Sequence, residues 1–317
     1  MQNHWRPTAA IETLRKRAQI LEKIRRFFSE RHVLEVETPL LCQHTVTDPY
    51  LQSLSSKCYG KDFFLQTSPE YCMKRLIAAG SGCIYQICKA FRADEFGRYH
   101  NPEFTILEWY RINYNHFDLM NEADQLLQLI LGCEPAEKMS YQDLFIKYLK
   151  IDPLIATLEQ LTTCCQHNRI QLPDNVDLTI DLILQVLMSD AIEPKIGLDK
   201  PIFIFHYPKN QAALSKIHPP DPRVSERFEI YYSGLELANG FHELTNAQEQ
   251  QKRFEENNLQ RKKLQLPEFP IDKNLIAALN QNFPKCSGIA LGVDRLVMLA
   301  TQKVSISDVI GFSINNC

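Results

Sequence analysis

The chain has 317 residues, with 35 lysines and arginines against 38 aspartates and glutamates, and a formal net charge of −3. This slightly acidic balance excludes the overall basic charge that dominates nucleic-acid affinity, although it leaves room for a local basic patch. The length is sufficient for a large core and for one or two domains. Because the sequence contains no repeat, low-complexity tract or clear linker, we expect a single domain over residues 1–317.

The cysteines and the apolar segments indicate in which cellular compartment the protein is expected. Ten cysteines are scattered along the chain, including the pairs Cys83/Cys88 and Cys164/Cys165, and none forms the C-x-x-C repeat that places thiolates around zinc. We expect reduced core thiols, as in cytosolic proteins. No run approaches the roughly 18 apolar residues of a membrane span, and the N-terminus lacks the apolar region of a signal peptide. The prediction is therefore a soluble cytoplasmic protein with no membrane partner.

The first part of the chain is predicted to combine helices with short strands. Apolar residues recur at helical spacing before Phe27 and Phe28, which indicates an amphipathic helix. Ser68 can cap a second helix that has Pro69 in its first turn. The predicted elements are a helix at 12–31, a strand at 33–41 broken at Pro39, a helix at 69–79, and two strands joined by a turn within 91–111.

The remainder alternates helical and strand patterns. Alternation on both sides of Ser233-Gly234 predicts a strand pair that turns there. The predicted elements are a helix at 117–131, several helices in an insertion at about 140–200, a strand at 201–208, the strand pair at 228–244, a charged helix at 246–264, and a strand leading into a helix at 287–300.

The segment FRADEFGRYHNPEFTILEWYR, residues 91–111, carries an unusual density of charge on its apolar scaffold. A solvated hairpin with cross-strand ion pairs is the simplest explanation, but it accounts poorly for the run His100-Asn101-Pro102-Glu103-Phe104. No glycine-rich nucleotide motif occurs in the chain. Arginines can still bind phosphate through several donors, so the candidate phosphate ligands are Arg92, Arg98, His100 and Arg295.

A second group of charges consists of Glu229, Glu236 and Glu243, which are spaced by seven residues. On a strand pair, Glu229 and Glu236 could converge on one side, and Mg²⁺ prefers hard carboxylate ligands bridged to phosphate. The same spacing fits a charged helix stripe. Tyr231-Tyr232, Ser233-Gly234 and Asn239-Gly240 argue against a helix.

Four segments, in order, resemble a known family: RRFFSERHVLEVETPLL, FRADEFGRYHNPEFTILEWY, FEIYYSGLELANGFHEL and SGIALGVDRLVML. They are similar to motif 1, motif 2, the lysine-branch signature and motif 3 of class II lysyl-tRNA synthetases, and most closely to the free-standing paralogues that attach (R)-β-lysine to elongation factor P. The resemblance runs from about residue 12 to the C-terminus. It implies an α+β class II synthetase catalytic fold, an antiparallel β-sheet flanked by helices.

The resemblance also implies an activity and partners. The expected reaction is ATP- and Mg²⁺-dependent formation of an aminoacyl-adenylate from (R)-β-lysine or lysine, followed by transfer to a lysine of elongation factor P. Two other readings stay open: a minimal synthetase that charges tRNA or another amine, and an inactive regulatory paralogue. We expect no anticodon-binding domain, and hence tRNA is not the expected acceptor. A homodimer is expected through motif 1, with Phe27, Phe28, Val33, Leu34 and Val36.

Site residues are implied by the same resemblance. Arg92 would hold the α-phosphate and the substrate carboxylate, and Phe104 would stack on adenine with Arg295 on its other face. Glu229 and Glu236 would hold Mg²⁺. The other expected ATP contacts are Ala93, Asp94, Arg98, His100, Asn101, Glu236, Leu237 and Gly292, and the expected amino-acid contacts are Ser68, Pro69, Glu70, Glu108, Tyr110, Glu243 and Ala290.

Two departures from the family pattern leave questions open. The motif 2 loop starts with Arg92-Ala93-Asp94-Glu95 where the family usually has R-x-E, so either Asp94 or Glu95 could meet adenine. Ala290 replaces a glycine of true lysyl-tRNA synthetases, which alters the substrate pocket by one methyl group.

Overall fold

The computed structural model describes every residue except 1–4, 174–176 and 282, so three residues of the predicted insertion at 140–200 lie outside the described part. The chain divides into two compact units, residues 1–113 with 245–317, and residues 114–244. The two units are described separately, and the single domain expected from the sequence stays a prediction.

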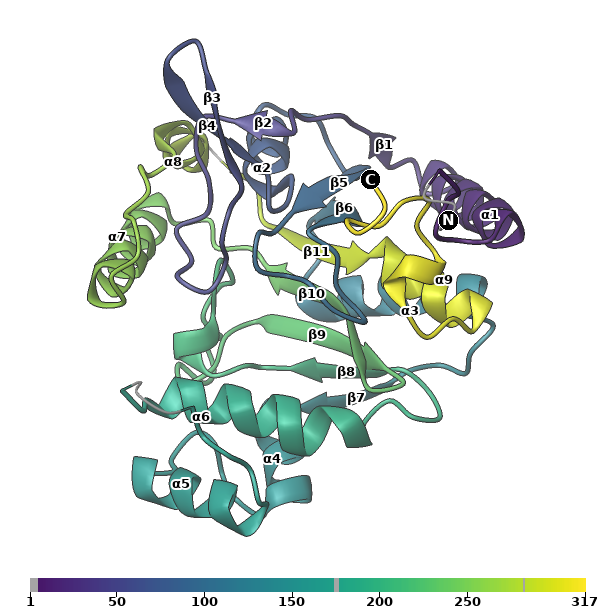
Figure 1. Cartoon of the computed structure of the whole chain (residues 1–317). Coiled ribbons are helices and arrows are strands. Elements are labelled where there is room, and N and C mark those ends of the chain that lie inside the picture. Colours follow the sequence, from purple (N-terminus) through teal and green to yellow (C-terminus); the bar gives the residue numbers. More distant parts are fainter. Residues whose placement is uncertain (1–4, 174–176, 282) are drawn as a thin grey trace. The chain divides into compact units, whose positions relative to one another are not determined.

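The first unit contains strands in the order β1-β5-β6-β11 (Figure 1). The short β1 runs parallel to β5, whereas β5, β6 and β11 are antiparallel, as expected for the motif 2 strand pair. A small sheet of order β2-β4-β3 belongs to the same unit. The bounds are β1 Leu34–Glu35, β5 Ile84–Phe91, β6 Glu103–Ile112, β11 Cys286–Gly292, β2 Leu41–Cys42, β4 Lys61–Leu65 and β3 Ser55–Cys58.

Helices surround these strands. The apolar face of α1 buries Phe28, whose ring stacks on Tyr85 of β5 at 4.5 Å between centroids and meets Trp109 of β6 edge-on at 5.3 Å. Such aromatic pairs add stabilisation beyond the area they bury. The helices of this unit are α1 Ile11–Ser29, α2 Glu70–Ala78, α7 Ala247–Lys263, α8 Lys273–Asn280 and α9 Val293–Thr301, with a 3₁₀ turn at Ile306–Asp308.

Several details of the first unit differ from the sequence expectations. Pro69 is the N-cap of α2 and not its first helical residue, and the Ser68 hydroxyl accepts only a long hydrogen bond, 3.4 Å, from the Glu70 amide. The first charged strand ends at Phe91, so residues 92–102 form a connection and not part of a strand. The β3–β4 hairpin and α8 were not predicted from the sequence, because their apolar patterns are short.

The second unit has strands in the order β10-β9-β8-β7. The β9–β10 pair turns at Ser233 and Gly234, with φ of 54° and 70°, which confirms the predicted turn. Positive φ is rare for residues other than glycine and is the conformation of tight hairpin turns. The strands are β7 Glu137–Ser140, β8 Ile202–Phe205, β9 Arg227–Tyr232 and β10 Leu235–His242.

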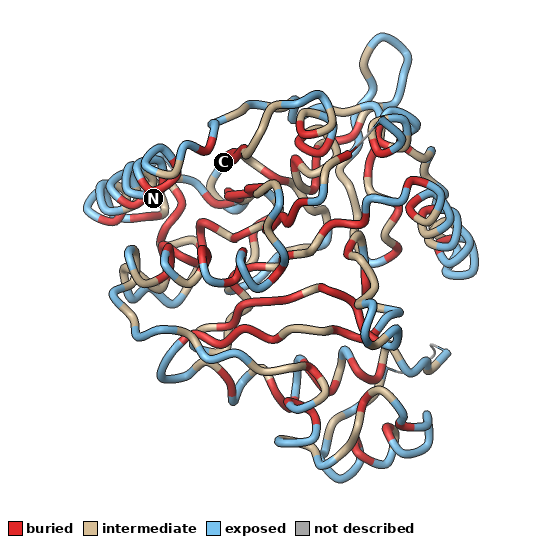
Figure 2. Tube along the Cα trace, turned by 180° about the vertical axis from the view of Figure 1, so that it is seen from behind, coloured by how far each residue is buried: buried red, intermediate tan, exposed pale blue. Residues whose placement is uncertain are grey.

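The helices predicted within 117–131 and 140–190 are confirmed. Asn115 and Asp118 form a capping box at the start of α3, and Thr157 and Gln160 form another at α5. Figure 2 shows that the strands are largely buried while the helices expose their outer faces. The elements are α3 His116–Leu131, α4 Tyr141–Leu149, α5 Leu158–His167, α6 Ile180–Leu187, a π-helical turn at Met188–Ile192, and 3₁₀ turns at Glu193–Lys195 and Lys209–Gln211.

Candidate functional site

Arg92 follows the last residue of β5 and begins the charged loop at 92–102. Its Nη1 donates to Glu95 Oε1 at 2.9 Å, and its guanidinium lies 5.1 Å from the centre of the Phe104 ring. The Arg92 Nε is buried and has no hydrogen-bond partner among the described residues. Asp94 is exposed, whereas Glu95 is engaged with Arg92. The loop therefore offers a half-buried cation with an unused donor, which suits an anion.

Arg295 and His100 form a second contact in the same unit. Arg295, in α9, directs Nη2 to His100 Nε2 at 2.7 Å, and its Nε lies 3.4 Å from the Tyr99 carbonyl oxygen. Burial and the neighbouring Arg295 cation lower the pKa of His100 below its ordinary value. The neutral imidazole then accepts the hydrogen bond from Arg295 and holds this guanidinium against the loop.

Asn101 and Arg98 anchor the loop to the C-terminal segment. The buried Asn101 donates to the Glu103 carbonyl at 2.6 Å and accepts from the Ile314 amide at 3.1 Å. The exposed Arg98 donates from Nε to the Val304 carbonyl at 2.7 Å. In this structure both side chains bind backbone of their own unit, so they shape the loop itself.

The central strands carry a buried polar pair. The Tyr110 hydroxyl donates to Glu108 Oε1 at 2.7 Å, and each of the two residues is buried, with 2% exposed. Ala290 of β11 is the Cα partner of Glu108 across the sheet and is half-buried. Gly292 ends β11 and directly precedes α9. The methyl group that distinguishes Ala290 therefore sits opposite Glu108.

Glu70 begins α2 and is paired within that helix. The Lys74 ammonium lies 2.7 Å from Glu70 Oε1, and the Lys74 side chain is only 1% exposed. The amino-acid contact expected from the sequence is thus balanced by a buried cation one turn along the helix. Glu70 keeps 14% of its side chain exposed.

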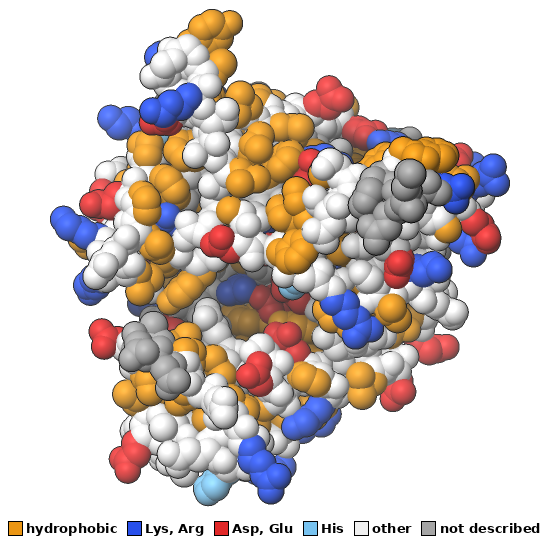
Figure 3. Space-filling model, viewed as in Figure 1, with side chains coloured by type: hydrophobic (Ala, Val, Ile, Leu, Met, Phe, Trp, Pro, Cys, Tyr) orange, Lys and Arg blue, Asp and Glu red, His pale blue; other side chains and the backbone are white. Residues whose placement is uncertain are grey.

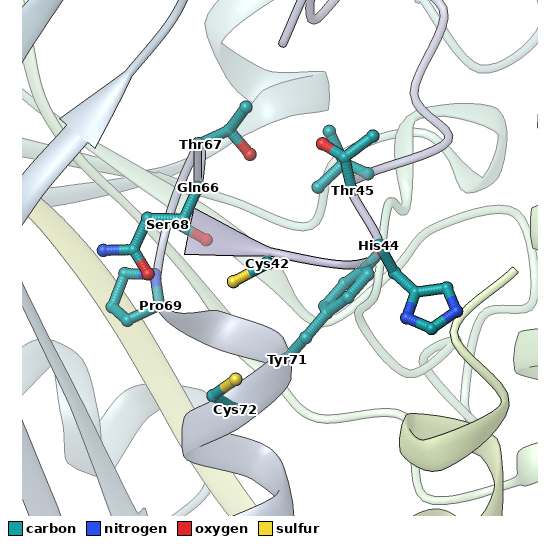
Figure 4. A pocket seen from close by; sticks show the side chains of 10 residues that line it. Cys42, His44, Thr45, Gln66, Thr67, Ser68, Pro69, Tyr71 and Cys72 are labelled. Carbon is teal, nitrogen blue, oxygen red and sulfur yellow. The ribbon is translucent and has the colours of Figure 1, made fainter. Parts of the chain in front are cut away.

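Ser68 and Pro69 line a pocket together with the thiols of Cys42 and Cys72 (Figure 4). The neighbouring Cys42 thiol is the largest cause that lowers the pKa of Cys72 to about 7, while Cys42 Sγ itself donates a hydrogen bond to the Pro39 carbonyl at 3.4 Å. Arg75 acts in the same direction, while burial opposes it. The pocket therefore contains a thiolate-prone cysteine beside the TSPE segment.

The second unit holds the acidic residues of the β9–β10 pair. Glu229 is buried and its carboxylate is surrounded by donors: Arg227 contacts one oxygen, and the hydroxyls of Tyr207 and Tyr231 both donate to the other. A metal ion at Glu229 would share the carboxylate with these three donors. Glu236 lies opposite Tyr231 in the register of β9 and β10, and its side chain is half-buried.

The other two expected residues of this strand pair are buried. Leu237 lies at a register shift between Glu236 and Ala238, and it is 2% exposed. Glu243 is 1% exposed and forms an isolated bridge with Ser215. Glu243 therefore places a buried carboxylate in the second unit.

One cluster was missed by the sequence analysis. Four of the nine histidines meet around Glu226 in the second unit. No local spacing signals it, because its members come from separate segments; only the folded chain brings together His116, His206, His218, His242 and Glu226.

The charged side chains on the surface are distributed as the nearly balanced composition predicts. On the face in Figure 3, basic and acidic side chains are interspersed and no single basic patch dominates. The ten cysteines are free thiols. Among the residues that the structure describes, no helix combines the length and the apolar character needed to cross a bilayer.

Comparisons with known proteins identify the family. The family described as tRNA synthetases class II (D, K and N) matches residues 3–316. A Salmonella typhi protein named elongation factor P--(R)-beta-lysine ligase is 51% identical over 317 residues, covering 98% of each chain. The α+β class II fold with a mostly antiparallel sheet flanked by helices is thereby confirmed. The chain belongs to the class II tRNA synthetase family of the aspartate, lysine and asparagine branch.

Proposed function

We propose that this chain is an ATP-dependent, AMP-forming ligase that activates (R)-β-lysine, or lysine, and transfers it to a lysine side chain of elongation factor P. The observation that carries the proposal is the 51% identity, over nearly the full length of both chains, to a relative with that name. A ligase that modifies a translation factor acts where translation occurs, so its proposed location is the cytoplasm.

In the first proposed step, a carboxylate oxygen of the amino acid attacks the α-phosphorus of ATP, and pyrophosphate leaves. Arg92 would hold the α-phosphate and the carboxylate, exchanging Glu95 for the ligand and using its unpartnered Nε. Arg295 would bind the outer phosphates. The Arg295 guanidinium is held in advance by neutral His100, and a preorganised donor favours the transition state because it needs little rearrangement.

The nucleotide would be enclosed by the charged loop. We propose Asp94 as the carboxylate that meets adenine, because its side chain is exposed on the loop, whereas Glu95 is less exposed and is the counter-ion of Arg92 in the free protein. Phe104 would offer its ring to the base. The remaining proposed ATP contacts are Ala93, Arg98, His100, Asn101, Glu236, Leu237 and Gly292.

Mg²⁺ would neutralise phosphate charge, and Glu229 and Glu236 are its proposed ligands. The half-buried Glu236 is the more accessible carboxylate, since Glu229 already accepts from Arg227, Tyr207 and Tyr231. Glu229 would thus share its carboxylate between the ion and these protein donors.

The substrate would be recognised as a diamine. Glu70 and Glu243 offer carboxylates to its side-chain ammonium, and Glu108 to its other amine, with Tyr110 holding Glu108 at 2.7 Å. A neutral side chain such as that of norleucine would forgo these charge-assisted contacts. We propose that the Ala290 methyl favours β-lysine over α-lysine. Ser68 and Pro69 complete the proposed amino-acid contacts.

In the second proposed step, the neutral amine of an acceptor lysine attacks the acyl carbon, and AMP leaves. A lysine has an ordinary pKa of about 10.4, so the site must orient and deprotonate it. Docking of a folded protein holds the reactants in an attacking geometry, which a small free amine cannot achieve. The slightly acidic chain favours this acceptor over a large polyanion such as tRNA.

Amino-acid-dependent ATP-pyrophosphate exchange tests the activation step. Arg92→Ala and Arg295→Ala should each lower exchange by about 100-fold or more, because each removes a contact to developing phosphate charge. Arg223→Ala, which removes an exposed arginine paired with Asp221, is the matched control and should retain exchange. Unimpaired exchange in either site variant would contradict the assignment.

We further propose a homodimer through the motif 1 segment. Phe27, Phe28 and Val33 are buried within the protomer, so they cannot supply the interface in this conformation. Leu34, with 54% exposed, and the neighbouring Leu40 and Leu41 remain available for a self-complementary contact. Light scattering should give twice 36.7 kDa, and Leu34→Glu should shift the mass towards that of the monomer. A monomer at micromolar concentration would refute this interface.

A further inference from the structure

Five titratable side chains gather in the second unit from separate segments. His116 is the first residue of α3, His206 follows β8, His218 lies in the connection before β9, Glu226 directly precedes β9, and His242 ends β10. His206 adopts a positive φ of 61°, which is uncommon for a residue other than glycine. A strained backbone that directs a side chain into a polar cluster is typical of a binding site.

Glu226 is at the centre of this histidine cluster. His218 Nδ1 lies 2.9 Å from one carboxylate oxygen, and His242 Nδ1 contacts the other. His116 Nε2 lies 3.2 Å from His206 Nε2, and the rings of His206 and His218 are 4.2 Å apart between centroids. The arrangement resembles the carboxylate–histidine contacts that orient metal ligands.

Two members of the cluster are shielded from water. His116 is 3% exposed and Glu226 is 6% exposed. Imidazole nitrogens and carboxylate oxygens are among the common protein ligands of transition-metal ions.

His116 supplies an independent observation. Its Nδ1 is buried and has no hydrogen-bond partner among the described residues. A buried polar atom without a partner costs free energy, and such an atom in a native protein calls for a ligand or an ion.

We propose that His116, Glu226 and His242 bind a divalent transition-metal ion such as Zn²⁺, with His206 and His218 as positioning residues. One ligand atom from each of the three residues lies within 4.8 Å of the others. Two imidazole nitrogens and one carboxylate oxygen suit Zn²⁺ or Co²⁺, whereas Mg²⁺ takes oxygen ligands. The bound ion would tie the start of α3 to the strands β9 and β10 and stabilise the second unit.

Cobalt titration of the full-length protein, after removal of metals with a chelator, tests this site. We expect one equivalent of Co²⁺ to give visible d–d absorption without a thiolate-to-cobalt charge-transfer band, and Zn²⁺ but not excess Mg²⁺ to displace it. Absence of saturable Co²⁺ binding by the wild-type protein would overturn the proposal. A charge-transfer band would also overturn it, because it would assign the ion to cysteines.

Two variants and a control assign the ligands. His116→Ala and His242→Gln should weaken binding on the order of tenfold or more, since each removes a ligand. His167→Ala, which changes an exposed histidine at the end of α5, should leave the affinity unchanged. Circular dichroism establishes that each variant is folded, and Zn²⁺ should raise the Tm of the wild-type and His167→Ala proteins only. Equal binding by all four proteins would contradict the assignment.

Discussion

The ammonium group of Lys74 lies 2.7 Å from the Glu70 carboxylate, one turn further along α2, and is almost completely buried. The negative charge proposed to recognise a substrate amine is therefore already compensated in the free protein. Substrate binding at Glu70 would add a second cation to this carboxylate and would not create its first ion pair.

A double-mutant cycle should measure this pairing. Glu70→Ala or Lys74→Met alone should lower the free energy of unfolding by about 3 kcal/mol, because each leaves one charge uncompensated. The double variant should lose less than the sum of the two. The matched control is the exposed pair Lys252–Glu256, whose coupling should stay below about 1 kcal/mol. Strict additivity at Glu70 and Lys74 in urea unfolding would refute the coupling.

Cys72 should be the most readily alkylated of the partly buried thiols near neutral pH. Its pKa is lowered from 9.0 to about 7, chiefly by the neighbouring Cys42 thiol, so its thiolate fraction rises as the pH increases through about 7. Burial raises the pKa of Cys88 to about 12, and that thiol should stay unreactive in the folded protein.

To measure this difference, the protein is treated briefly with iodoacetamide at pH values from about 6 to about 9, in steps of roughly one pH unit. Mass-spectrometric mapping then gives the alkylated fraction of Cys72 and Cys88 at each pH. Cys42→Ala removes the neighbouring thiol and should shift the Cys72 profile to higher pH. An unchanged profile would mean that Cys42 has no part in lowering the pKa.

Gly240 should tolerate no side chain. A Cβ there would lie 2.4 Å from the ring of Phe228, its partner across the β9–β10 pair. Gly240→Ala should destabilise the protein by about 1–3 kcal/mol, as overpacking does. The same change in a Phe228→Leu background should cost less, and Gly311→Ala, with open space around it, is the control. An equal urea midpoint for wild type and Gly240→Ala would contradict this packing.

Asp294 should contribute to both stability and activation. It is 2% exposed, pairs with Arg17 Nη1 at 2.6 Å, and accepts from the Thr105 amide at 2.7 Å. Asp294→Asn removes the charge and should cost about 3 kcal/mol. Because Asp294 precedes Arg295, pyrophosphate exchange should fall as well. Arg17→Lys retains a cation and should lose less in both assays; full activity of Asp294→Asn would argue against this role.

The turn and the helices that were predicted correctly are those whose formation depends on residues close together in the chain. Alternation and the Ser233-Gly234 pair predicted the β9–β10 turn, and helical periodicity predicted α1 and α3. These signals depend on neighbours in the chain, and the later packing does not override them.

Contacts between distant segments escaped prediction for a physical reason. Phe27 and Phe28 are equally apolar whether they form an interface or a core, so only the fold shows that they are buried. The pairing of Glu70 with Lys74 could have been read from their spacing of four residues. The histidine cluster around Glu226 joins residues far apart in the chain, for which no periodic pattern exists.

The most direct test of the proposed function is the intact mass of purified elongation factor P after incubation with this protein, Mg²⁺-ATP and (R)-β-lysine. The proposed function predicts that the mass of elongation factor P rises by one lysyl unit. This gain should require ATP, be lost with the Arg92→Ala enzyme, and disappear when the acceptor lysine is changed to arginine. Efficient charging of tRNA while elongation factor P keeps its mass would contradict it.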